Sequence, residues 1–145
     1  MTTINTYLTF NGNCEEAFNF YKSVFGGEFS YMSKFKDMPE DPKFQIADSD
    51  KENVMHISLP ISEEAILMGS DTSGELTANF TQGNNFSISI NTDNKNEADR
   101  LFSNLSEDGM VIMPMNNTFW NSYFGMFTDK FGIQWMINFN EEEHK

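Results

Sequence analysis

Asn13-Cys-Glu-Glu-Ala-Phe-Asn-Phe-Tyr-Lys-Ser-Val24 has a second copy in the chain, Asn94-Lys-Asn-Glu-Ala-Asp-Arg-Leu-Phe-Ser-Asn-Leu105, at a constant offset of 81 that carries Asn13 onto Asn94. Each copy opens with an Asn followed three residues later by a Glu, which is typical of a helix N-cap with a capping-box partner. Apolar residues then recur at helical spacing, and Gly26-Gly27 and Gly109 follow where such helices end. The two copies therefore predict two amphipathic helices, each capped by its own Asn.

The segments around the two helices repeat as well, although two unrelated amphipathic helices could also be aligned in this way. A short β-type run precedes each helix, at residues 6–10 and 86–90. Both halves therefore predict the order βαβββ. Three further β-type runs follow each helix: residues 28–35, 54–61 and 65–69 after the first, and residues 110–113, 120–128 and 133–139 after the second.

This repeat predicts an α+β fold. We expect a single domain of residues 1–145, built from two βαβββ modules at about 4–72 and 84–140, whose mixed sheets pair around a cleft. In the run 86–90, three apolar residues alternate with Ser87 and Ser89. We expect the apolar face of this strand to lie beneath the second helix, and the two serines to face the cleft.

The composition excludes several classes of function. The net charge of −13 repels a polyphosphate backbone and an anionic membrane surface. The first residues lack the basic and apolar regions of a secretory signal, and no apolar run approaches the ~20 residues of a membrane span. The single Cys14 excludes an internal disulfide and a cysteine-rich zinc site. We therefore expect a cytoplasmic protein with neither nucleic-acid nor membrane partners.

Few residues offer catalytic chemistry. His56 shares a face of its strand with Ser58, and is either a structural histidine or a general base or ligand hydrogen-bonder. His144 lies in an acidic tail, and the run 48–52 lacks the Gly and Glu of a calcium loop, so both are expected to be solvated. The sequence contains no nucleophile elbow, no P-loop and no Gly-rich strand-to-helix turn of a nucleotide-fold methyltransferase.

Two blocks of sequence carry a resemblance to a known family. They are Tyr7-Leu-Thr-Phe-Asn-Gly-Asn-Cys-Glu-Glu-Ala-Phe-Asn-Phe-Tyr-Lys-Ser-Val-Phe-Gly-Gly27 and Met113-Pro-Met-Asn-Asn-Thr-Phe-Trp-Asn-Ser-Tyr-Phe-Gly-Met-Phe-Thr-Asp-Lys-Phe-Gly-Ile-Gln-Trp-Met-Ile-Asn138. From about residue 4 to residue 139, the chain resembles the PhnB-like branch of the glyoxalase/bleomycin-resistance/extradiol-dioxygenase (vicinal oxygen chelate) superfamily. Members of this branch commonly carry the label 3-demethylubiquinone-9 3-methyltransferase. The resemblance implies paired βαβββ modules, in agreement with the repeat, and a homodimer.

The resemblance also implies where a metal would bind. The superfamily uses one divalent metal that is held by His and carboxylate ligands on four strands. These positions fall on Thr6 (or Asn5 if the register slips by one), Met68, Ser87 and Met136. None of these residues is a His or a carboxylate, so we expect no metal and no cofactor.

Methionine and aromatic residues gather near the former ligand positions, although part of this group is expected to be ordinary core packing. We expect binding of a small apolar or aromatic molecule in the inter-module cleft, without metal. The alternative is an enzyme of the same superfamily, a lyase, isomerase or dioxygenase with an atypical site, or a metal-free enzyme with His56 as its base. The expected ligand-binding residues are Met68, Ser87, Ser89, Trp120, Tyr123, Trp135 and Met136.

Overall fold

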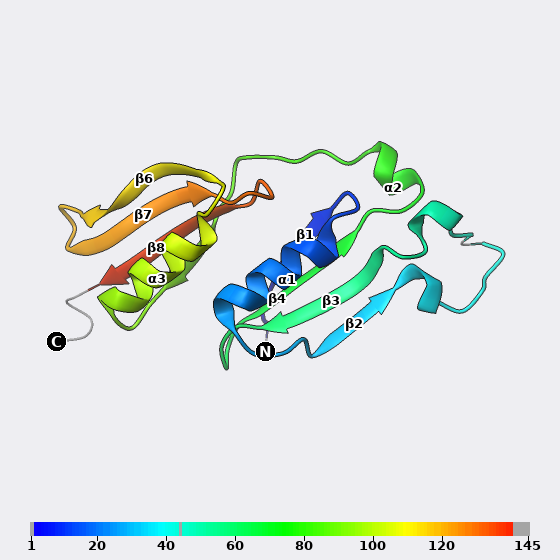
Figure 1. Ribbon diagram of the computed structural model, residues 1–145, viewed down its shortest axis with the longest axis horizontal. Helices are drawn as coiled ribbons and strands as arrows, with labels where there is room; N and C mark the ends of the chain where they lie inside the picture. Colours follow the sequence, from blue (N-terminus) through cyan, green and yellow to red (C-terminus); the bar gives the residue numbers. More distant parts are fainter. Residues whose placement is uncertain (1, 44, 141–145) are drawn as a thin grey trace. The chain divides into compact units, whose positions relative to one another are not determined.

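The structure is a computed structural model that describes residues 2–43 and 45–140. Its internal contacts divide the chain into two compact units, an N-terminal module that ends at Thr81 and a C-terminal module that begins at Gln82. Each module contains the βαβββ order that the repeat predicts (Figure 1), so the predicted α+β fold class is confirmed. Among the described residues, no helix is long and apolar enough to cross a lipid bilayer.

The sheet of the N-terminal module has the strand order β1-β4-β3-β2. β1 is parallel to β4, and the remaining pairs are antiparallel. Two short 3-10 helices, Phe35–Asp37 and Asp48–Asp50, lie between β2 and β3, and the short α2 (Glu75–Ala78) follows β4. The repeated elements are β1 (Thr6–Phe10), α1 (Cys14–Phe25), β2 (Tyr31–Lys34), β3 (Val54–Pro60) and β4 (Ile66–Asp71).

The sheet of the C-terminal module has the order β5-β8-β7-β6, which is the same pattern of connections. β5 is parallel to β8, and the other two pairs are antiparallel. Each module therefore brings its first and last strands together at one side of its sheet. The elements are β5 (Ile88–Asn91), α3 (Lys95–Leu105), β6 (Met110–Asn117), β7 (Ser122–Thr128) and β8 (Gln134–Asn140).

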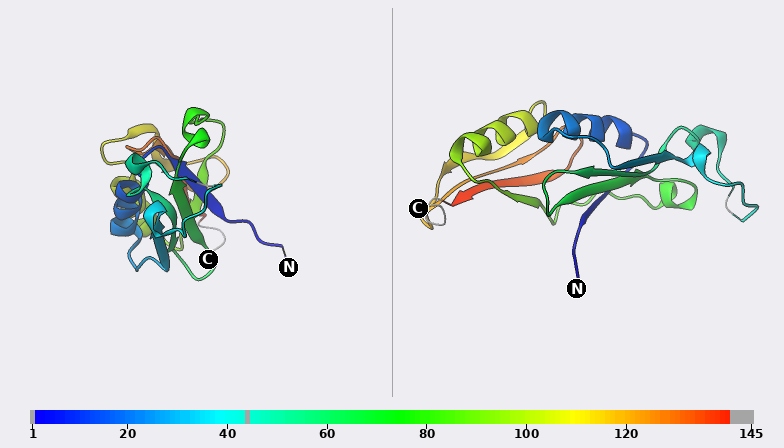
Figure 2. Two further views of the ribbon diagram at one scale, coloured as in Figure 1. Left: turned by 90° about the vertical axis from the view of Figure 1, so that its right-hand side faces the viewer. Right: turned by 90° about the horizontal axis from the view of Figure 1, so that it is seen from below.

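In the N-terminal module, α1 covers one face of the sheet, as the right-hand view of Figure 2 shows. Gly69 of β4 faces this helix, because a Cβ atom added there would lie 2.7 Å from Cε1 of Phe18. The register partners of Gly69 are Leu8 and Ile57, and both are buried. Because side chains alternate along a strand, Met68 points to the opposite, open face of the sheet.

In the C-terminal module, α3 covers one face of its sheet in the same way (Figure 2). The rings of Phe102 and Phe127 pack edge-on with centroids 5.1 Å apart, and a Cβ at Gly125 would lie 2.7 Å from Cε2 of Phe102. Trp135, the register partner of Phe127, is 0% exposed on this side. Its indole N–H donates to Oδ2 of Asp129 at 2.9 Å, so the polar atom of the ring is satisfied within the core.

The two repeated helices begin differently. Asn94 caps α3 as predicted, since its Oδ1 accepts the N–H of Glu97 at 2.7 Å. Asn13 makes no side-chain capping bond, and Oδ1 of Asp71 accepts the N–H of Cys14 at 2.9 Å instead. Asn13 therefore occupies the predicted N-cap position, but the predicted capping by its side chain is wrong, because a carboxylate at the end of β4 reaches the start of α1.

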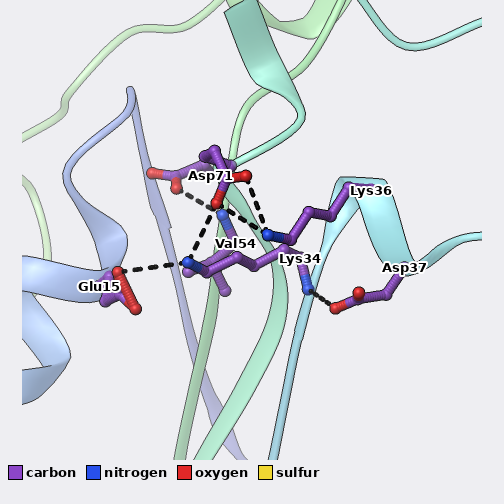
Figure 3. A network of polar contacts seen from close by, with 7 residues as sticks. Glu15, Lys34, Lys36, Asp37, Val54 and Asp71 are labelled. Carbon is purple, nitrogen blue, oxygen red and sulfur yellow. Dashed lines mark hydrogen bonds and ion pairs between the residues drawn. The ribbon is translucent and has the colours of Figure 1, made fainter. Parts of the chain in front are cut away.

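Asp71 is a buried carboxylate that joins three segments of the N-terminal module. Its Oδ1 also accepts the N–H of Gly12 at 2.9 Å. Its Oδ2 accepts the N–H of Val54, also at 2.9 Å (Figure 3). The neighbouring Cys14 is 0% exposed, and burial, together with the carboxylates of Asp71 and Glu15, raises the pKa of its thiol. The thiolate is thus disfavoured, and Cys14 is a structural rather than a reactive cysteine.

Ion pairs at the surface connect the end of β2 with its surroundings. Nζ of Lys34 lies 3.3 Å from Glu52 and 3.9 Å from Glu15 of α1 (Figure 3). Nζ of Lys36 lies 2.9 Å from Glu52, and the carboxylate of Asp37 accepts the backbone N–H of Lys34. Exposed pairs of this kind contribute little stability individually.

One of the two predicted helix ends also differs. Gly26 caps α1 with φ 81°, as expected. α3 already ends at Leu105, and its C-cap is Ser106, three residues before Gly109. Gly109 is needed for a different reason, because an added Cβ would collide with the carbonyl oxygen of Thr128.

Candidate functional site

The open face of the N-terminal sheet carries one row of four side chains. Tyr7 is the register partner of Met68, Met68 of Ser58, and Ser58 of Tyr31, so all four side chains leave the sheet on the same face. Tyr7 and Tyr31 are 46% and 52% exposed. The predicted site residue Met68 therefore lies between Tyr7 and Ser58, on the face that α1 leaves uncovered.

His56 makes the polar contacts of this face. Its Nδ1 lies 3.3 Å from Oη of Tyr7, and its Nε2 lies 3.0 Å from Oγ of Ser58, which confirms that His56 and Ser58 share a face. The rings of Tyr7 and Tyr31 each have their centroids 5.7 Å from that of the imidazole. Ser33 is the register partner of His56 and belongs to the same face. We call Tyr7, Tyr31, Ser33, His56 and Ser58 the His56 cluster.

The strand register corrects one of the positions inferred for a metal ligand. Thr6 pairs with Leu67, which is 1% exposed, whereas Tyr7 pairs with Met68. Thr6 therefore points to the α1 side, away from Met68, and the expectation that it shares the site with Met68 is wrong. On β1, the residue beside Met68 is Tyr7.

The open face of the C-terminal sheet carries a row of methionines. Ser89 is the register partner of Met136, Met136 of Met126, and Met126 of Met113. Met126 points away from α3, because its neighbour Gly125 faces that helix. We call Met113, Met126 and Met136 the methionine row.

Ser87 and Trp120 lie outside the strands of this sheet, Ser87 just before β5 and Trp120 in the turn before β7. Ser87 precedes β5 by one residue and is two residues from Ser89. Trp120 lies in the turn before β7 rather than in the strand predicted for residues 120–128, because β7 begins at Ser122. The ring of Trp120 is 50% exposed and packs edge-on against Phe124, with centroids 6.1 Å apart.

Tyr123 and Trp135 lie on the α3 side of the C-terminal sheet. Oη of Tyr123 donates to Oδ1 of Asp99 at 2.5 Å, and Nζ of Lys95 lies 4.5 Å from the centroid of the Tyr123 ring. The hydrogen bond to Asp99, with a smaller effect of desolvation, raises the pKa of Tyr123 to about 12. Trp135 is buried in the core. The structure therefore separates both residues from Met136, which is on the open face.

A separate cavity of about 630 Å³ lies in the connection between β2 and β3. It contains no residue of the His56 cluster or of the methionine row, and none of the predicted site residues lines it. Its lining includes Phe35, Lys36, Met38, Pro39, Pro42, Ile46 and Lys51.

The side chains on the open faces do not fit the divalent metal of the superfamily. On the open faces, Tyr7 lies beside Met68 and Ser89 lies beside Met136. Thioethers suit soft ions and hydroxyls are weak donors, whereas zinc, nickel, iron or manganese need imidazole or carboxylate ligands. Within residues 2–43 and 45–140, no three His, Cys, Asp or Glu side chains are placed to hold a metal ion. We therefore derive no step through a metal.

A family model described as 3-demethylubiquinone-9 3-methyltransferase matches residues 2–138 of this chain. The chain belongs to this family. Protein YjdN of Escherichia coli (strain K12) is 31% identical over 144 residues, which cover 93% of each chain. Protein PA1353 from Pseudomonas aeruginosa is 42% identical, and its crystal structure aligns with a TM-score of 0.81 over 97% of this chain and 98% of that one.

The 3-demethylubiquinone-9 3-methyltransferase family shares its fold with the wider superfamily. A glyoxalase/bleomycin resistance protein/dioxygenase family enzyme from Burkholderia phytofirmans PsJN aligns with a TM-score of 0.58 at 17% identity, over 92% of this chain and 96% of that one. This likeness concerns the fold alone, and it confirms the predicted glyoxalase/bleomycin-resistance architecture.

The family description implies a methyl donor such as S-adenosylmethionine, and the chain does not fit one. Each sheet contains one parallel strand pair, whereas a nucleotide-fold methyltransferase needs alternating parallel βα units. At the first strand-to-helix turn, the N–H groups of Gly12 and Cys14 already donate to Asp71. We therefore derive no methyl-transfer step.

Proposed function

We propose that this protein binds a small apolar or aromatic molecule without a metal, on the open faces of its sheets. The observation that carries the proposal is the chemistry of those faces. On one sheet the rings of Tyr7 and Tyr31 flank His56, and Met68 lies beside Tyr7. On the other sheet lies the methionine row. Flexible thioethers adapt to the shape of an apolar ligand, and flat rings offer stacking surfaces. His56 on the first of these faces, and Ser89 on the second, each supply a polar group that would orient a ligand bound to that face.

The first test uses the methionine methyl groups as local reporters. We expect naphthalene, added to protein labelled with 13C at its methionine methyls, to shift the signals of Met68, Met126 and Met136 in an NMR titration. Met32 is the internal control, because its register partner is the buried Ile57 on the α1 side of the sheet. Equal shifts at Met32 and Met68, or no shift at all, would contradict the proposal.

A metal measurement separates this function from metal chemistry. We expect elemental analysis of the purified protein to find less than about one tenth of an equivalent of any transition metal, because His56 is not joined, among the described residues, by two further His, Cys, Asp or Glu side chains with which to hold one. A stoichiometric metal would instead favour the superfamily enzyme.

A second candidate function is a metal-free enzyme with His56 as its base. The observation in its favour is the chain of contacts from Tyr7 through His56 to Ser58. A histidine that is oriented by one hydroxyl and contacts another is an arrangement that general acid–base catalysis uses. Turnover that is lost in His56→Gln while naphthalene binding remains would establish this alternative.

We also propose that the protein is a homodimer that pairs through β6, which lies at the edge of its sheet. Met110, Val111, Ile112 and Met113 on this strand are between 44% and 63% exposed, and an apolar edge strand favours pairing with another chain. Light scattering is expected to give about twice 16.7 kDa, and Ile112→Lys to lower this mass. Asn104→Lys on the exposed surface of α3 is the control. A monomeric parent protein would refute the dimer.

A further inference from the structure

The turn between β1 and α1 contains the pair Asn11-Gly12, which is the only Asn-Gly pair in the chain. An asparagine that precedes a glycine is especially prone to deamidation, because glycine has no side chain to hinder attack by its backbone nitrogen. Both residues are exposed, so water reaches them. The turn therefore places a chemically reactive pair at the surface of the N-terminal module.

Deamidation is a reaction between two groups of this pair. The backbone nitrogen of Gly12 loses its proton and attacks Cγ of Asn11, so that a new bond joins these two atoms. The bond from Cγ to the side-chain nitrogen breaks, and this nitrogen takes up a proton and leaves as ammonia. Water then opens the resulting succinimide ring at either of its carbonyl groups, which gives an aspartate or an isoaspartate at position 11.

In the folded module, residues at the end of β4 hold both reacting groups. Oδ1 of Asp71 accepts the N–H of Gly12 at 2.9 Å, and Oγ1 of Thr72 donates to Oδ1 of Asn11 at 3.0 Å. The carboxylate disfavours loss of the Gly12 proton, because the resulting amide anion would face a second negative charge. The bond from Thr72 restrains the rotation that would bring Cγ of Asn11 over the nitrogen of Gly12.

The internal repeat shows that a module of this kind does not require an Asn-Gly pair. At the offset of 81, Thr92 and Asp93 stand at the equivalent places before α3. In the N-terminal module, Gly12 has φ 100°, a left-handed conformation that favours glycine. The reactive pair thus occurs in the one module whose last strand supplies contacts to both of its reacting groups.

We infer that Asn11-Gly12 is a deamidation site that the folded N-terminal module keeps silent, through the contacts of Asp71 with Gly12 and of Thr72 with Asn11. This property goes beyond the proposed binding function and does not depend on it. Opening of the turn releases both groups, and loss of ammonia then marks the chain permanently. The product carries a new carboxylate near that of Asp71, so like charges oppose re-formation of the turn.

The first test measures the rate of deamidation at position 11 by peptide mass mapping, at mildly alkaline pH. We expect the parent protein to react at least about tenfold more slowly in buffer than in guanidinium chloride that unfolds it, which is the effect of one hydrogen bond to a charged acceptor. Asn11→Gln should remove the acidic product that anion-exchange chromatography separates. Equal rates in the two solutions, or no product at position 11 in either, would overturn the inference.

Thr72→Val tests the contacts themselves, because valine keeps the shape of threonine but lacks the hydroxyl that holds Asn11. Thr77→Val is the matched control, since Thr77 donates to Oγ1 of Thr72 at 3.2 Å rather than to Asn11. In buffer we expect Thr72→Val to deamidate about fivefold faster than Thr77→Val, which is the effect of one net hydrogen bond. In guanidinium chloride the two rates should be equal. Equal rates in buffer as well would contradict the role of Thr72.

Gly69→Ala separates local opening of the turn from unfolding of the whole module. Its added Cβ would collide with Phe18, so it destabilises the module while the contacts of Asp71 and Thr72 remain. We expect Gly69→Ala to deamidate more slowly in buffer than Thr72→Val. The reverse order would show that only unfolding of the module exposes the pair, and the inference that these two contacts keep it silent would be wrong.

Discussion

Replacing Asp71 with alanine is expected to lower the free energy of unfolding of the N-terminal module by about 4 kcal/mol. The substitution leaves the N–H groups of Gly12, Cys14 and Val54 without their acceptor. Each buried donor that loses its partner costs about 1–3 kcal/mol. Two of these donors lie where the turn enters α1 and the third at the start of β3, so the substitution also loses a connection between distant segments of the chain. The expected result is a large shift of the urea midpoint, followed by circular dichroism.

Two further variants test whether the lost hydrogen bonds cause the destabilisation of Asp71→Ala. Asp71→Asn keeps one carbonyl oxygen for Gly12 and Cys14 but turns an amide NH2 group toward Val54, so its effect should be intermediate. Asp48→Ala removes a carboxylate whose side chain is 95% exposed and pairs with Lys51 at the surface, so we expect a change below about 0.5 kcal/mol. Equal effects of Asp71→Ala and Asp48→Ala would contradict the role assigned to Asp71.

Gly69→Ala is expected to destabilise the protein by about 2–3 kcal/mol through overpacking between α1 and its sheet. The new Cβ would lie 2.7 Å from Cε1 of Phe18 and 2.8 Å from the backbone oxygen of Leu8, which cannot move without disturbing β1. Gly125→Ala also meets an aromatic ring, Cε2 of Phe102 at 2.7 Å, but its other close neighbour is the flexible Sδ of Met115 at 2.6 Å, and its nearest backbone atom, the oxygen of Met113, is at 3.1 Å. We expect a smaller loss, about 1–2 kcal/mol, in the second case.

The matched control for both substitutions is Gly83→Ala, where an added Cβ would meet only Oδ1 of Asn85 at 3.6 Å. Its melting temperature should stay close to that of the parent. Phe18→Leu in the Gly69→Ala background should recover part of the loss, because it removes the ring from the collision. A melting temperature of Gly69→Ala equal to that of Gly83→Ala would show that α1 tolerates the extra atom.

The sequence was sufficient for the order of elements, because that order depends on local patterns. β1 has the predicted bounds, and the Asn94 cap was found because its partner Glu97 is three residues away. The position at which α1 begins was predicted as well, but its capping partner was not predictable, since the acceptor Asp71 is 57 residues from Cys14. Nothing near Asn13 in the sequence indicates that a distant carboxylate takes over the capping role.

The site was predicted less completely, because its faces depend on the register between strands. Alternation along β8 does show that the adjacent Trp135 and Met136 point to opposite faces, so the sequence already indicated that these two residues cannot line the same site. The contact between Tyr7 and His56 joins strands 49 residues apart in sequence, so no local pattern reveals it. Met113 meets Met126 only because the register of β6 shifts on both sides of Met113.

The burial of Cys14 and Trp135 in different modules has a practical consequence. The chain contains one cysteine, in the N-terminal module, and two tryptophans, both in the C-terminal module. A thiol reagent therefore reports only the opening of the first module, whereas the emission maximum of the buried Trp135 indole moves to the red only when the second module opens. Recorded together on one unmodified sample, the two signals show whether the halves of this internally repeated chain unfold as one cooperative unit or one after the other.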